Sequence, residues 1–375
     1  MKYILKIVIF GLNIVYFFLK LFPSKNRVVM MSRQSNYVNV DFRLLGDKLQ
    51  EKYEVIYLCK TLDGKENAKV FTMISYGFHM FKQMYYLATS RVCILDTYIP
   101  VISILKHKKN LTIIQMWHSN GTMKNFGYSS LGKREGTLSS YAKVLKMHEG
   151  YSYVLCSGEG YVDHLVKGFH VSPDIIKIYS LPRLDLLTNI EYETNAKNKI
   201  FQKYPCLNNG KENVLYAPTF RKDEHDFNVY FKELVDSFDY DKYNLIIKLH
   251  PLSKVHVQSE KAIVDNSFST FDMLFVTDKM ISDYSCIIYE AGVRDIPLYF
   301  YAYDLSYYDY IRGLALDYKE LPGYTENDAK KLVKDLDKKY DMNYYHEFMF
   351  KYVRYTKDCT LRLAQFVDEC ISGVK

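Results

Sequence analysis

Strand-like apolar runs alternate with helix-like runs along nearly the whole chain. This alternation predicts an α/β architecture with mostly parallel sheets. In the first half, strands are predicted at Val28–Ser32, Glu54–Cys59, Val92–Leu95, Leu111–Trp117, Tyr153–Cys156 and Ile175–Tyr179. In the second half, strands are predicted at Val214–Ala217, Asn244–Leu249, Met280–Ser282 and Pro297–Tyr301.

A break divides this series near residues 187–209, where the stretch TNIEYETNAKNK and the turn PCLNNG are polar. The sequence therefore predicts two α/β halves, with polar motifs at the strand ends of both halves facing a cleft between them. The predicted divisions are an N-terminal helix at 1–25, a first half at 26–188, a second half at 189–345 and a helical segment at 346–375.

Length and composition fit two globular domains and exclude several other classes of protein. Of the 375 residues, 48% are hydrophobic and 25% are charged, which is typical of globular domains. The seven cysteines are odd in number and form no CxxC pair, which favours a reducing compartment over a disulfide framework or a zinc site. The net charge of +7 is modest, and no basic stripe interleaved with aromatic residues predicts a nucleic-acid partner.

The first 40 residues combine an apolar run with basic side chains. Six Lys or Arg residues and no acidic residue precede Asp41. The apolar run Ile7–Leu19 is short for a membrane span, which needs roughly 20 residues, and no signal-peptide cleavage site follows it. Because Lys6, Asn13 and Lys20 share one helical face, we expect an interfacial helix whose basic residues meet anionic lipid on the cytoplasmic side. The alternative is a buried first helix of the core.

The most informative stretch is FVTDKMISDYSCIIYEAGVRDIPLYFYAYD at 275–304. It predicts a strand, a polar turn, a helix at Cys286–Val293 and a second strand. Ser282, Asp283 and Ser285 then lie at a helix N-terminus beyond a strand end, where open α/β sheets bind phosphorylated ligands. The alternative is that they only cap the helix. Glu290 either accepts hydrogen bonds from a ribose or is a solvated helix residue, which is the simpler interpretation.

Two histidines follow buried-looking strands. His118, in QMWHSNGTMKNFGY, can act as a general base on a hydroxyl near neutral pH. After it, Gly121 lets the backbone approach a ligand closely, and Lys124 can pair with a phosphate. His250 ends the strand-like segment IIKLHP on the same side as Lys248. The alternative for each histidine is a structural role in a loop.

Two further segments offer phosphate ligands. In LYAPTFR, Thr219 and Arg221 combine a hydroxyl with the planar fork of a guanidinium, which suits a phosphate. In RGLALDYKELP, Arg312 follows the segment YAYDLSYYDY, which we interpret as an aromatic strand and loop. The alternatives are a surface turn for the first segment and a solvated loop for the second. No P-loop, GxGxxG, HExxH or metal-ligand cluster occurs in the chain.

These motifs together resemble a known family. The blocks WHSNGTMKNFG, LPRLDLL, YAPTFR, KLHP, SDYSCIIYEAGVRDIPLYFYAYDL and RGLALDYKELPG resemble, in this order, signature blocks of the CDP-glycerol glycerophosphotransferases of Gram-positive cell-wall polymer synthesis. The resemblance covers about residues 110–325. It implies a GT-B fold, in which two Rossmann-like halves bind the acceptor and the CDP-alditol respectively. It also implies a peripheral location on the cytoplasmic side of the cell membrane, where the acceptor is carried on a polyprenyl diphosphate lipid.

The resemblance also implies roles for individual residues. His118 corresponds to the histidine that deprotonates the acceptor hydroxyl, and His250 to the one that neutralises charge on the transferred phosphate. Thr219 and Arg221 match the phosphate-binding turn of the family. Ser282, Asp283, Tyr284 and Ser285 match a TDYSS-like block, in which Cys286 stands where a second Ser is common.

The expected reaction transfers glycerol phosphate from CDP-glycerol to a hydroxyl of a polyprenyl-diphosphate-linked saccharide and releases CMP. No cofactor is implied, and the requirement for Mg²⁺ and the oligomeric state stay open. The WHxxGxxKxFG form and the chain length resemble the primase subgroup of teichoic acid synthesis. The alternatives are a ribitolphosphotransferase using CDP-ribitol, a short polymerase, a GT-B glycosyltransferase using a nucleotide sugar, and a non-catalytic scaffold at the membrane.

Overall fold

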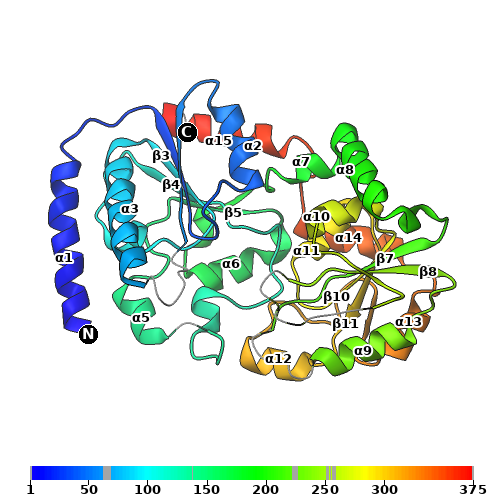
Figure 1. The fold of residues 1–375 in the computed structure, drawn as a ribbon. Helices are drawn as coiled ribbons and strands as arrows, with labels where there is room; N and C mark the ends of the chain where they lie inside the picture. The colour runs from blue at the N-terminus through cyan, green and yellow to red at the C-terminus, as the bar shows by residue number, and fades with distance from the viewer. Residues whose placement is uncertain are drawn as a thin grey trace. The chain divides into compact units, whose positions relative to one another are not determined.

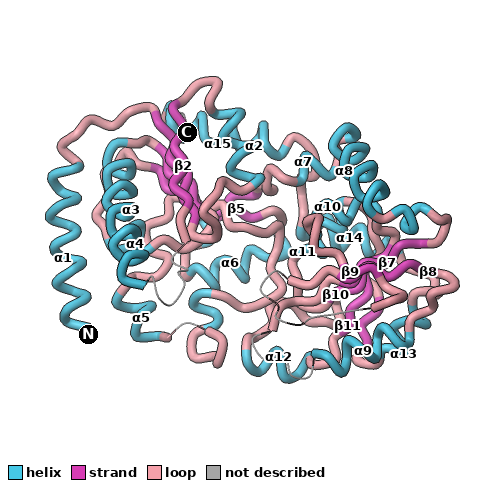
Figure 2. Tube along the Cα trace, viewed as in Figure 1, coloured by secondary structure: helices cyan, strands magenta, loops and turns pink. Residues whose placement is uncertain are grey.

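The computed structural model describes residues 2–61, 69–136, 138–221, 227–250, 253, 255 and 259–373. The chain forms two compact units. The first comprises Met1–His118, Phe126–Arg183 and Lys357–Lys375, and the second comprises Ser119–Asn125 and Leu184–Thr356. Within the described ranges, each unit contains a six-stranded parallel sheet flanked by helices (Figure 2). The predicted α/β class with two Rossmann-like halves is therefore confirmed.

The sheet of the first unit has the strand order β2-β1-β3-β4-β5-β6. Its strands are β1 (Arg27–Ser32), β2 (Glu54–Cys59), β3 (Val92–Leu95), β4 (Thr112–Gln115), β5 (Tyr153–Cys156) and β6 (Ile176–Ile178). All six strands predicted for this half are confirmed, with ends that differ by no more than two residues. Every residue of β1 is buried, so other parts of the unit cover both faces of the sheet at this strand.

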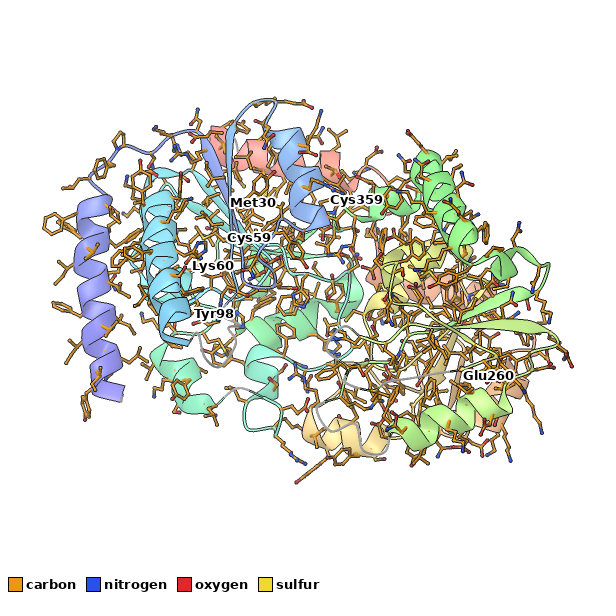
Figure 3. All side chains as sticks on the ribbon, in the orientation of Figure 1. Met30, Cys59, Lys60, Tyr98, Glu260 and Cys359 are labelled. Atoms are coloured by element: carbon orange, nitrogen blue, oxygen red, sulfur yellow. The ribbon has the colours of Figure 1, made fainter. Side chains whose placement is uncertain are left out.

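The helices of the first unit pack around this sheet. They are α1 (Lys2–Leu19), α2 (Val40–Leu49), α3 (Lys69–Thr89), α4 (Pro100–Ile104), α5 (Ser139–Val144), α6 (Val162–Phe169) and α15 (Cys359–Ser372). α2 begins after Asn39, whose side chain accepts a hydrogen bond from the Phe42 amide at 2.8 Å. α15 packs against α2 in the hydrophobic core that also contains Met30 of β1 (Figure 3).

The predicted C-terminal helical segment at 346–375 is divided between the two units. α14 (Met342–Tyr352) belongs to the second unit, whereas α15 belongs to the first. The segment Ser119–Asn125 is likewise part of the second unit, although first-unit sequence flanks it on both sides. Local periodicity indicates helices and strands but carries no information on which distant elements pack together, so neither assignment was predicted.

The N-terminal helix α1 runs alongside α3 (Figure 1). The sequence predicts that the face with Asn13 and Lys20 meets lipid. Instead, these side chains donate hydrogen bonds to the carbonyl oxygens of Ile104 and Lys106, at 2.9 and 2.8 Å. Most apolar side chains of α1 are exposed, which also contradicts the alternative of a buried core helix. Within the described residues, no helix combines the length and apolar character needed to cross a membrane.

The sheet of the second unit has the strand order β12-β11-β10-β7-β8-β9. Its strands are β7 (Glu212–Tyr216), β8 (Tyr243–Ile247), β9 (Ile263–Val264), β10 (Lys279–Ser282), β11 (Leu298–Tyr301) and β12 (Tyr324–Glu326). β9 and β12 were not predicted. β9 has only two residues, and β12, with the sequence YTE, is not an apolar run. The order reverses between β7 and β10, which is the switch point where Rossmann sheets bind ligands.

The helices of the second unit cover this sheet and supply its aromatic core. They are α7 (Leu184–Leu187), α8 (Ile190–Lys203), α9 (Phe227–Ser237), α10 (Thr270–Met273), α11 (Ile287–Val293), α12 (Leu305–Ile311), α13 (Ala329–Asp335) and α14. The α13 and α9 helices pack together over one face of the sheet, where Leu234, Tyr299 and Leu332 are fully or almost fully buried.

The polar stretch predicted as a break between the halves is mostly helical. It contains α8, which is capped by the side chain of Asn189. Glu193 of this helix pairs with Arg294 at 2.9 Å. The units part between Arg183 and Leu184, ahead of this stretch. Polarity here reflects the solvent-facing surface of a helix rather than a linker.

The segment YAYDLSYYDY was predicted as a strand and loop, but only Tyr301 belongs to a strand, as the last residue of β11, and the residues from Leu305 onwards form the helix α12. Tyr308 and Ile311, three residues apart, are its buried positions. The Tyr308 ring stacks on Tyr284, with ring centroids 4.0 Å apart. A spacing of three between buried residues is typical of a helix. The many aromatic residues in this segment made the buried positions impossible to distinguish from the exposed ones in the sequence.

Candidate functional site

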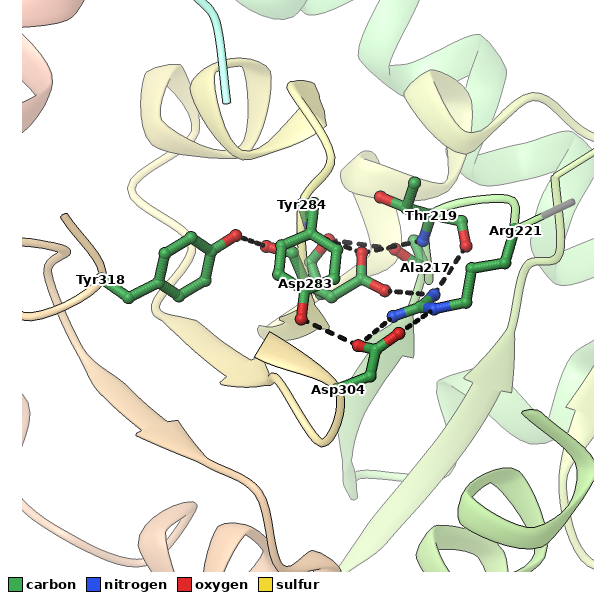
Figure 4. A network of polar contacts seen from close by, with 8 residues as sticks. Ala217, Thr219, Arg221, Asp283, Tyr284, Asp304 and Tyr318 are labelled. Atoms are coloured by element: carbon green, nitrogen blue, oxygen red, sulfur yellow. Dashed lines mark hydrogen bonds and ion pairs between the residues drawn. The ribbon is translucent and has the colours of Figure 1, made fainter. Parts of the chain in front are cut away.

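The switch point of the second sheet brings several predicted site residues together (Figure 4). Asp283 follows β10 directly and is fully buried. One carboxylate oxygen accepts a hydrogen bond from the Thr219 amide at 2.8 Å, and the other accepts one from Arg221 Nη1 at 2.8 Å. The segments that follow β7 and β10 are thus joined by one buried carboxylate.

Arg221 is the centre of this network. Its Nε and Nη2 donate to the two carboxylate oxygens of Asp304, at 2.7 and 2.9 Å. Its Nη1 also donates to the Thr219 carbonyl oxygen at 2.8 Å. With the bond to Asp283, four hydrogen bonds engage a group that has five N–H donors. The guanidinium therefore cannot offer its planar fork to a phosphate without leaving this network.

Burial and aromatic rings complete the environment of Arg221, which is only 8% exposed. The rings of Tyr284, Tyr303 and Tyr308 surround the guanidinium, with its carbon 5.4, 4.8 and 5.6 Å from their centroids. Burial lowers the pKa of Arg221, but the Asp283 and Asp304 carboxylates outweigh this and raise the pKa above its ordinary value. Arg221 is therefore a permanent buried cation.

The block SDYS divides into buried and accessible parts. The Ser282 hydroxyl donates to the Ala217 carbonyl oxygen at 3.0 Å, and the Tyr284 hydroxyl donates to Asp304 at 2.8 Å. Ser282, Asp283 and Tyr284 are fully buried, whereas Ser285 is partly exposed. As placed, the first three residues build the turn, and Ser285 is the member of the block that a ligand can reach.

The segment Ser119–Asn125 carries Gly121 and Lys124 into the second unit. Lys124 forms an antiparallel bridge with Leu314, the second residue after Arg312. The flanking backbone bonds join the Asn125 amide to the Gly313 carbonyl oxygen at 2.9 Å and the Ala315 amide to the Met123 carbonyl oxygen at 3.0 Å. This pairing brings two predicted phosphate ligands, Lys124 and Arg312, to one place.

Electrostatics connect these residues with the buried network and with His250. Burial lowers the pKa of Lys124, and the charges of Arg312 and Arg221 lower it further, while Asp283 opposes them. His250 is exposed, yet nearby residues partly desolvate its ring, and this desolvation, together with the charge of Lys124, lowers its pKa. His250 is therefore neutral at pH 7, and the site has an excess of positive charge from lysine and arginine.

Glu290 is 3% exposed, so its interpretation as a solvated helix residue is wrong. Its Oε1 accepts a hydrogen bond from Asn120 Nδ2 at 3.0 Å, and Asn120 is fully buried. Both Tyr289 and Glu290 of α11 are buried. The sequence of this seven-residue helix did not indicate that the side bearing Glu290 is covered by other parts of the unit.

In the first unit, His118 follows β4 at the carboxyl edge of the sheet. Its Nδ1 lies 3.1 Å from the carbonyl oxygen of Asp96. A carbonyl oxygen only accepts, so the proton resides on Nδ1 and the lone pair on Nε2. This is the tautomer that a general base acting through Nε2 requires. Arg183 Nη2 donates to the His118 carbonyl oxygen at 3.3 Å, and Arg183 is itself paired with the buried Asp41.

The comparisons with known proteins identify the family. Residues 14–361 match the family described as CDP-Glycerol:Poly(glycerophosphate) glycerophosphotransferase. The chain belongs to this family. Its members are CDP-alcohol phosphotransferases of teichoic acid synthesis, which confirms the family expected from the six sequence blocks.

Individual relatives are similar over most of their length. The chain is 30% identical to a teichoic acid ribitol-phosphate primase of Bacillus spizizenii over 83% of this chain and 82% of the relative. It is 28% identical to the teichoic acid glycerol-phosphate primase of Bacillus subtilis, over 78% of this chain and 77% of the relative. The solved structure of the wall teichoic acid polymerase TagF has a TM-score of 0.70 at 18% identity, covering 99% of this chain and 98% of that chain. This structural likeness confirms the GT-B-like fold.

Several residues of these two polar regions were not predicted. Asp96 follows the predicted strand β3 as His118 follows β4, so its position at a strand end was the available signal. Asp304 and Asn120 lie inside the sequence blocks that resemble the family, but nothing in a single sequence indicates that they are the partners of Arg221 and Glu290. Among the described residues, no group of three or more His, Cys, Asp and Glu side chains is arranged to hold a metal ion.

The buried ion pairs of Arg221 give a prediction for stability. Replacing Arg221 by Met leaves the buried Asp283 carboxylate and the partly buried Asp304 carboxylate without their cation, and we expect a loss of about 3–5 kcal/mol in the free energy of unfolding. Arg221→Lys keeps the charge but not the fork, so its loss should be smaller. Urea unfolding at pH 7.5 measures both. An Arg221→Met loss below about 1 kcal/mol would contradict the network as described.

Asp96 gives a pH-dependent prediction. Asp96 is 1% exposed. Burial raises the pKa of its carboxyl group from 3.8 to about 6, although the Ser32 and Thr97 hydroxyls lower it. Between these two values the folded state binds more protons than the unfolded state, so this group makes stability fall as the pH rises. Asp96→Asn removes that dependence and should stabilise the protein by up to ~3 kcal/mol at pH 7.5, with little gain at pH 4.

The variant Asp41→Asn is the matched control for Asp96→Asn. Asp41 is equally buried, but it accepts hydrogen bonds from the Arg183 amide and from Arg183 Nε, at 2.9 and 2.8 Å. Neutralising it should destabilise the protein at pH 7.5, opposite in sign to Asp96→Asn. Thermal unfolding of both variants at pH 4 and 7.5 measures the contrast. If Asp96→Asn is no more stable than the parent protein at pH 7.5, the ionised Asp96 carboxylate does not destabilise the folded state as predicted.

Proposed function

We propose that this protein transfers glycerol phosphate from CDP-glycerol to a hydroxyl of a polyprenyl-diphosphate-linked saccharide, releasing CMP, in the synthesis of teichoic acid or a related cell-wall polymer. Family membership supports the reaction class. The observation that carries the proposal for this chain is the convergence of Lys124, Arg312 and His250 beside the switch point of the second unit.

The second unit supplies the chemistry for the donor. The diphosphate of a CDP-alditol carries negative charge that grows on the bridging oxygen as CMP leaves. Lys124 and Arg312 provide positive charge for these oxygens, and the accessible Ser285 hydroxyl provides a hydrogen-bond donor. Arg221 acts behind them: as a buried cation it holds Asp283 and the turn in place. His250, neutral at pH 7, contacts the phosphate being transferred through an N–H donor.

The first unit supplies the chemistry for the acceptor. In this proposal, Nε2 of His118 accepts the proton of the acceptor hydroxyl, and the hydroxyl oxygen forms a bond to the β-phosphorus. The bond between the β-phosphorus and the bridging oxygen breaks, and its electron pair leaves with CMP. Positioning and charge stabilisation account for most of the rate of such transfers. The Asp96 carbonyl oxygen keeps the required tautomer of His118.

A second candidate is the transfer of ribitol phosphate from CDP-ribitol. The specific observation in its favour is the 30% identity with a ribitol-phosphate primase. Both donors share the CDP group, so the charged residues described above serve either one. The difference lies in the polyol chain, which offers additional hydroxyl groups when it is ribitol.

The test is CMP release from CDP-glycerol and, separately, from CDP-ribitol, with a disaccharide diphosphate lipid analogue as acceptor and mass analysis of the product. One added glycerol phosphate is the expected product, and a ladder would indicate a polymerase. His118→Ala should reduce the rate by about 10²–10⁴-fold if His118 is the general base. A reduction below tenfold would exclude that role. Folded protein that releases no CMP from either donor would overturn the proposed function.

We also propose that the protein binds the anionic cytoplasmic surface of the cell membrane through α1. The support is the row of exposed apolar side chains on this helix, including Ile7, Phe10 and Phe17, which are 71%, 68% and 58% exposed. Lys6 lies on the same helix and is exposed, and Phe78 of the adjacent α3 is also exposed. Apolar contact with the acyl boundary and charge contact with anionic headgroups act together in such helices.

Serine replacement of Ile7, Phe10 and Phe17 together should lower binding to vesicles of anionic phospholipid by at least about tenfold, because the buried apolar area is lost. Co-sedimentation with the vesicles measures the binding. The matched control is Ile190→Ser, which changes an apolar side chain of α8 that is 82% exposed, and this variant should bind as the parent protein does. Equal loss in the control, or none in the triple variant, would contradict the role of α1.

A further inference from the structure

The segment Ser119–Asn125 is held on the second unit by three separate anchors. The first is the hydrogen bond from Asn120 Nδ2 to Glu290 Oε1 at 3.0 Å. Both side chains are buried, where an amide or a carboxylate without a partner would be costly. The pair therefore fixes both the position of residue 120 and the direction of its side chain.

The second anchor is Tyr289, the neighbour of Glu290 on α11. Its hydroxyl donates to the Thr122 carbonyl oxygen at 3.2 Å. Its ring lies so close to the backbone of Gly121 that a Cβ atom at this position would collide with it. Gly121 is therefore needed for close packing of the segment on α11, which is a different use of the glycine from the ligand approach predicted from the sequence.

The third anchor is the backbone pairing of Met123 and Asn125 with residues 313–315. Gly313 has φ +84°, and a Cβ atom there would collide with the Asn125 side chain. Lys124 lies between these paired positions. The anchors on α11 and on residues 313–315 therefore bracket the residue whose charge interacts with Asp283, Arg312 and His250.

We propose that Asn120, Tyr289 and Glu290 form a latch that holds the segment Ser119–Asn125 on the second unit and thereby sets the position of the Lys124 ammonium group for the diphosphate of the donor. This inference rests on the proposed function, in which Lys124 contacts that diphosphate. The three residues are positioning residues. In this proposal Glu290 acts through Asn120, which is a different role from the hydrogen bonds to a ribose that the sequence suggested.

The hydrogen-bond donor and the hydrogen-bond acceptor in the pair of residues 120 and 290 can be exchanged by mutation, which gives a direct test of the latch. Asn120→Asp places two carboxylates against each other in a buried site, so the segment should separate from α11. Glu290→Gln keeps an acceptor for Asn120. The double variant Asn120→Asp/Glu290→Gln restores the hydrogen bond with its direction reversed, because the amide introduced on α11 can donate to the carboxylate introduced at position 120.

The experiment measures the Kd of the full-length protein for CDP-glycerol without acceptor, and kcat and KM with acceptor. Asn120→Asp should weaken donor binding by about 100-fold or more, Glu290→Gln by less than about fivefold, and the double variant should return to within about fivefold of the parent protein. Failure of the double variant to recover, while the parent protein binds the donor, overturns the latch and leaves the proposed function intact.

The variant Lys124→Ala tests whether the latch acts by positioning Lys124 or by a general effect on the structure of the second unit. If the latch acts through Lys124, adding Asn120→Asp to Lys124→Ala should weaken donor binding by less than about threefold beyond Lys124→Ala alone. Fully additive losses overturn the latch. If Asn120→Asp does not fold, Tyr289→Phe takes its place, since it removes only the hydroxyl and should raise the Kd by about three- to tenfold. A parent protein that binds neither CDP-glycerol nor CDP-ribitol overturns the latch and the proposed function together.

Discussion

The second unit depends on one buried cation. Arg221 follows β7, Asp283 follows β10 and Asp304 follows β11, so the pairing of one guanidinium with two carboxylates ties together the carboxyl ends of three neighbouring strands. Without a cation, the buried Asp283 and the partly buried Asp304 carboxylates would destabilise this edge, and a lysine could not match both of them with one ammonium group. The tyrosine rings around Arg221 cover the guanidinium and limit its access to water, which strengthens its attraction to the carboxylates.

The segments that carry the candidate ligands are built upon this edge. Tyr318 donates to the Asp283 carbonyl oxygen at 2.7 Å, which connects the loop after Arg312 to the same turn. That loop pairs with the segment containing Lys124. A disturbance at Arg221 is therefore expected to reach Lys124 and Arg312 through these connections.

The sequence predicted the architecture well because burial of parallel strands leaves a strong apolar signal at β1, β3 and β5. It also selected the correct strand ends, since polar residues after buried strands are conspicuous. It could not divide those polar residues into partners of one another and ligands of a substrate. Thr219, Arg221 and Asp283 have the chemistry of a phosphate site, and only the distances reveal that the Asp283 carboxylate pairs with Arg221 and with the backbone amide of Thr219. Asn120 and Glu290 are 170 positions apart, so no local pattern joins them.

The charges beside the switch point of the second unit are arranged in two layers. The inner layer contains the guanidinium of Arg221 and the carboxylates of Asp283 and Asp304, and the outer layer contains Lys124 and Arg312. Asp283 raises the pKa of Lys124 against the effect of burial, whereas the charge of Arg221 lowers it. The outer layer then presents two cations to a ligand, whereas the inner layer alone would repel a diphosphate. The inner network thus has two effects: it fixes the turn, and its Asp283 carboxylate favours the protonated form of Lys124.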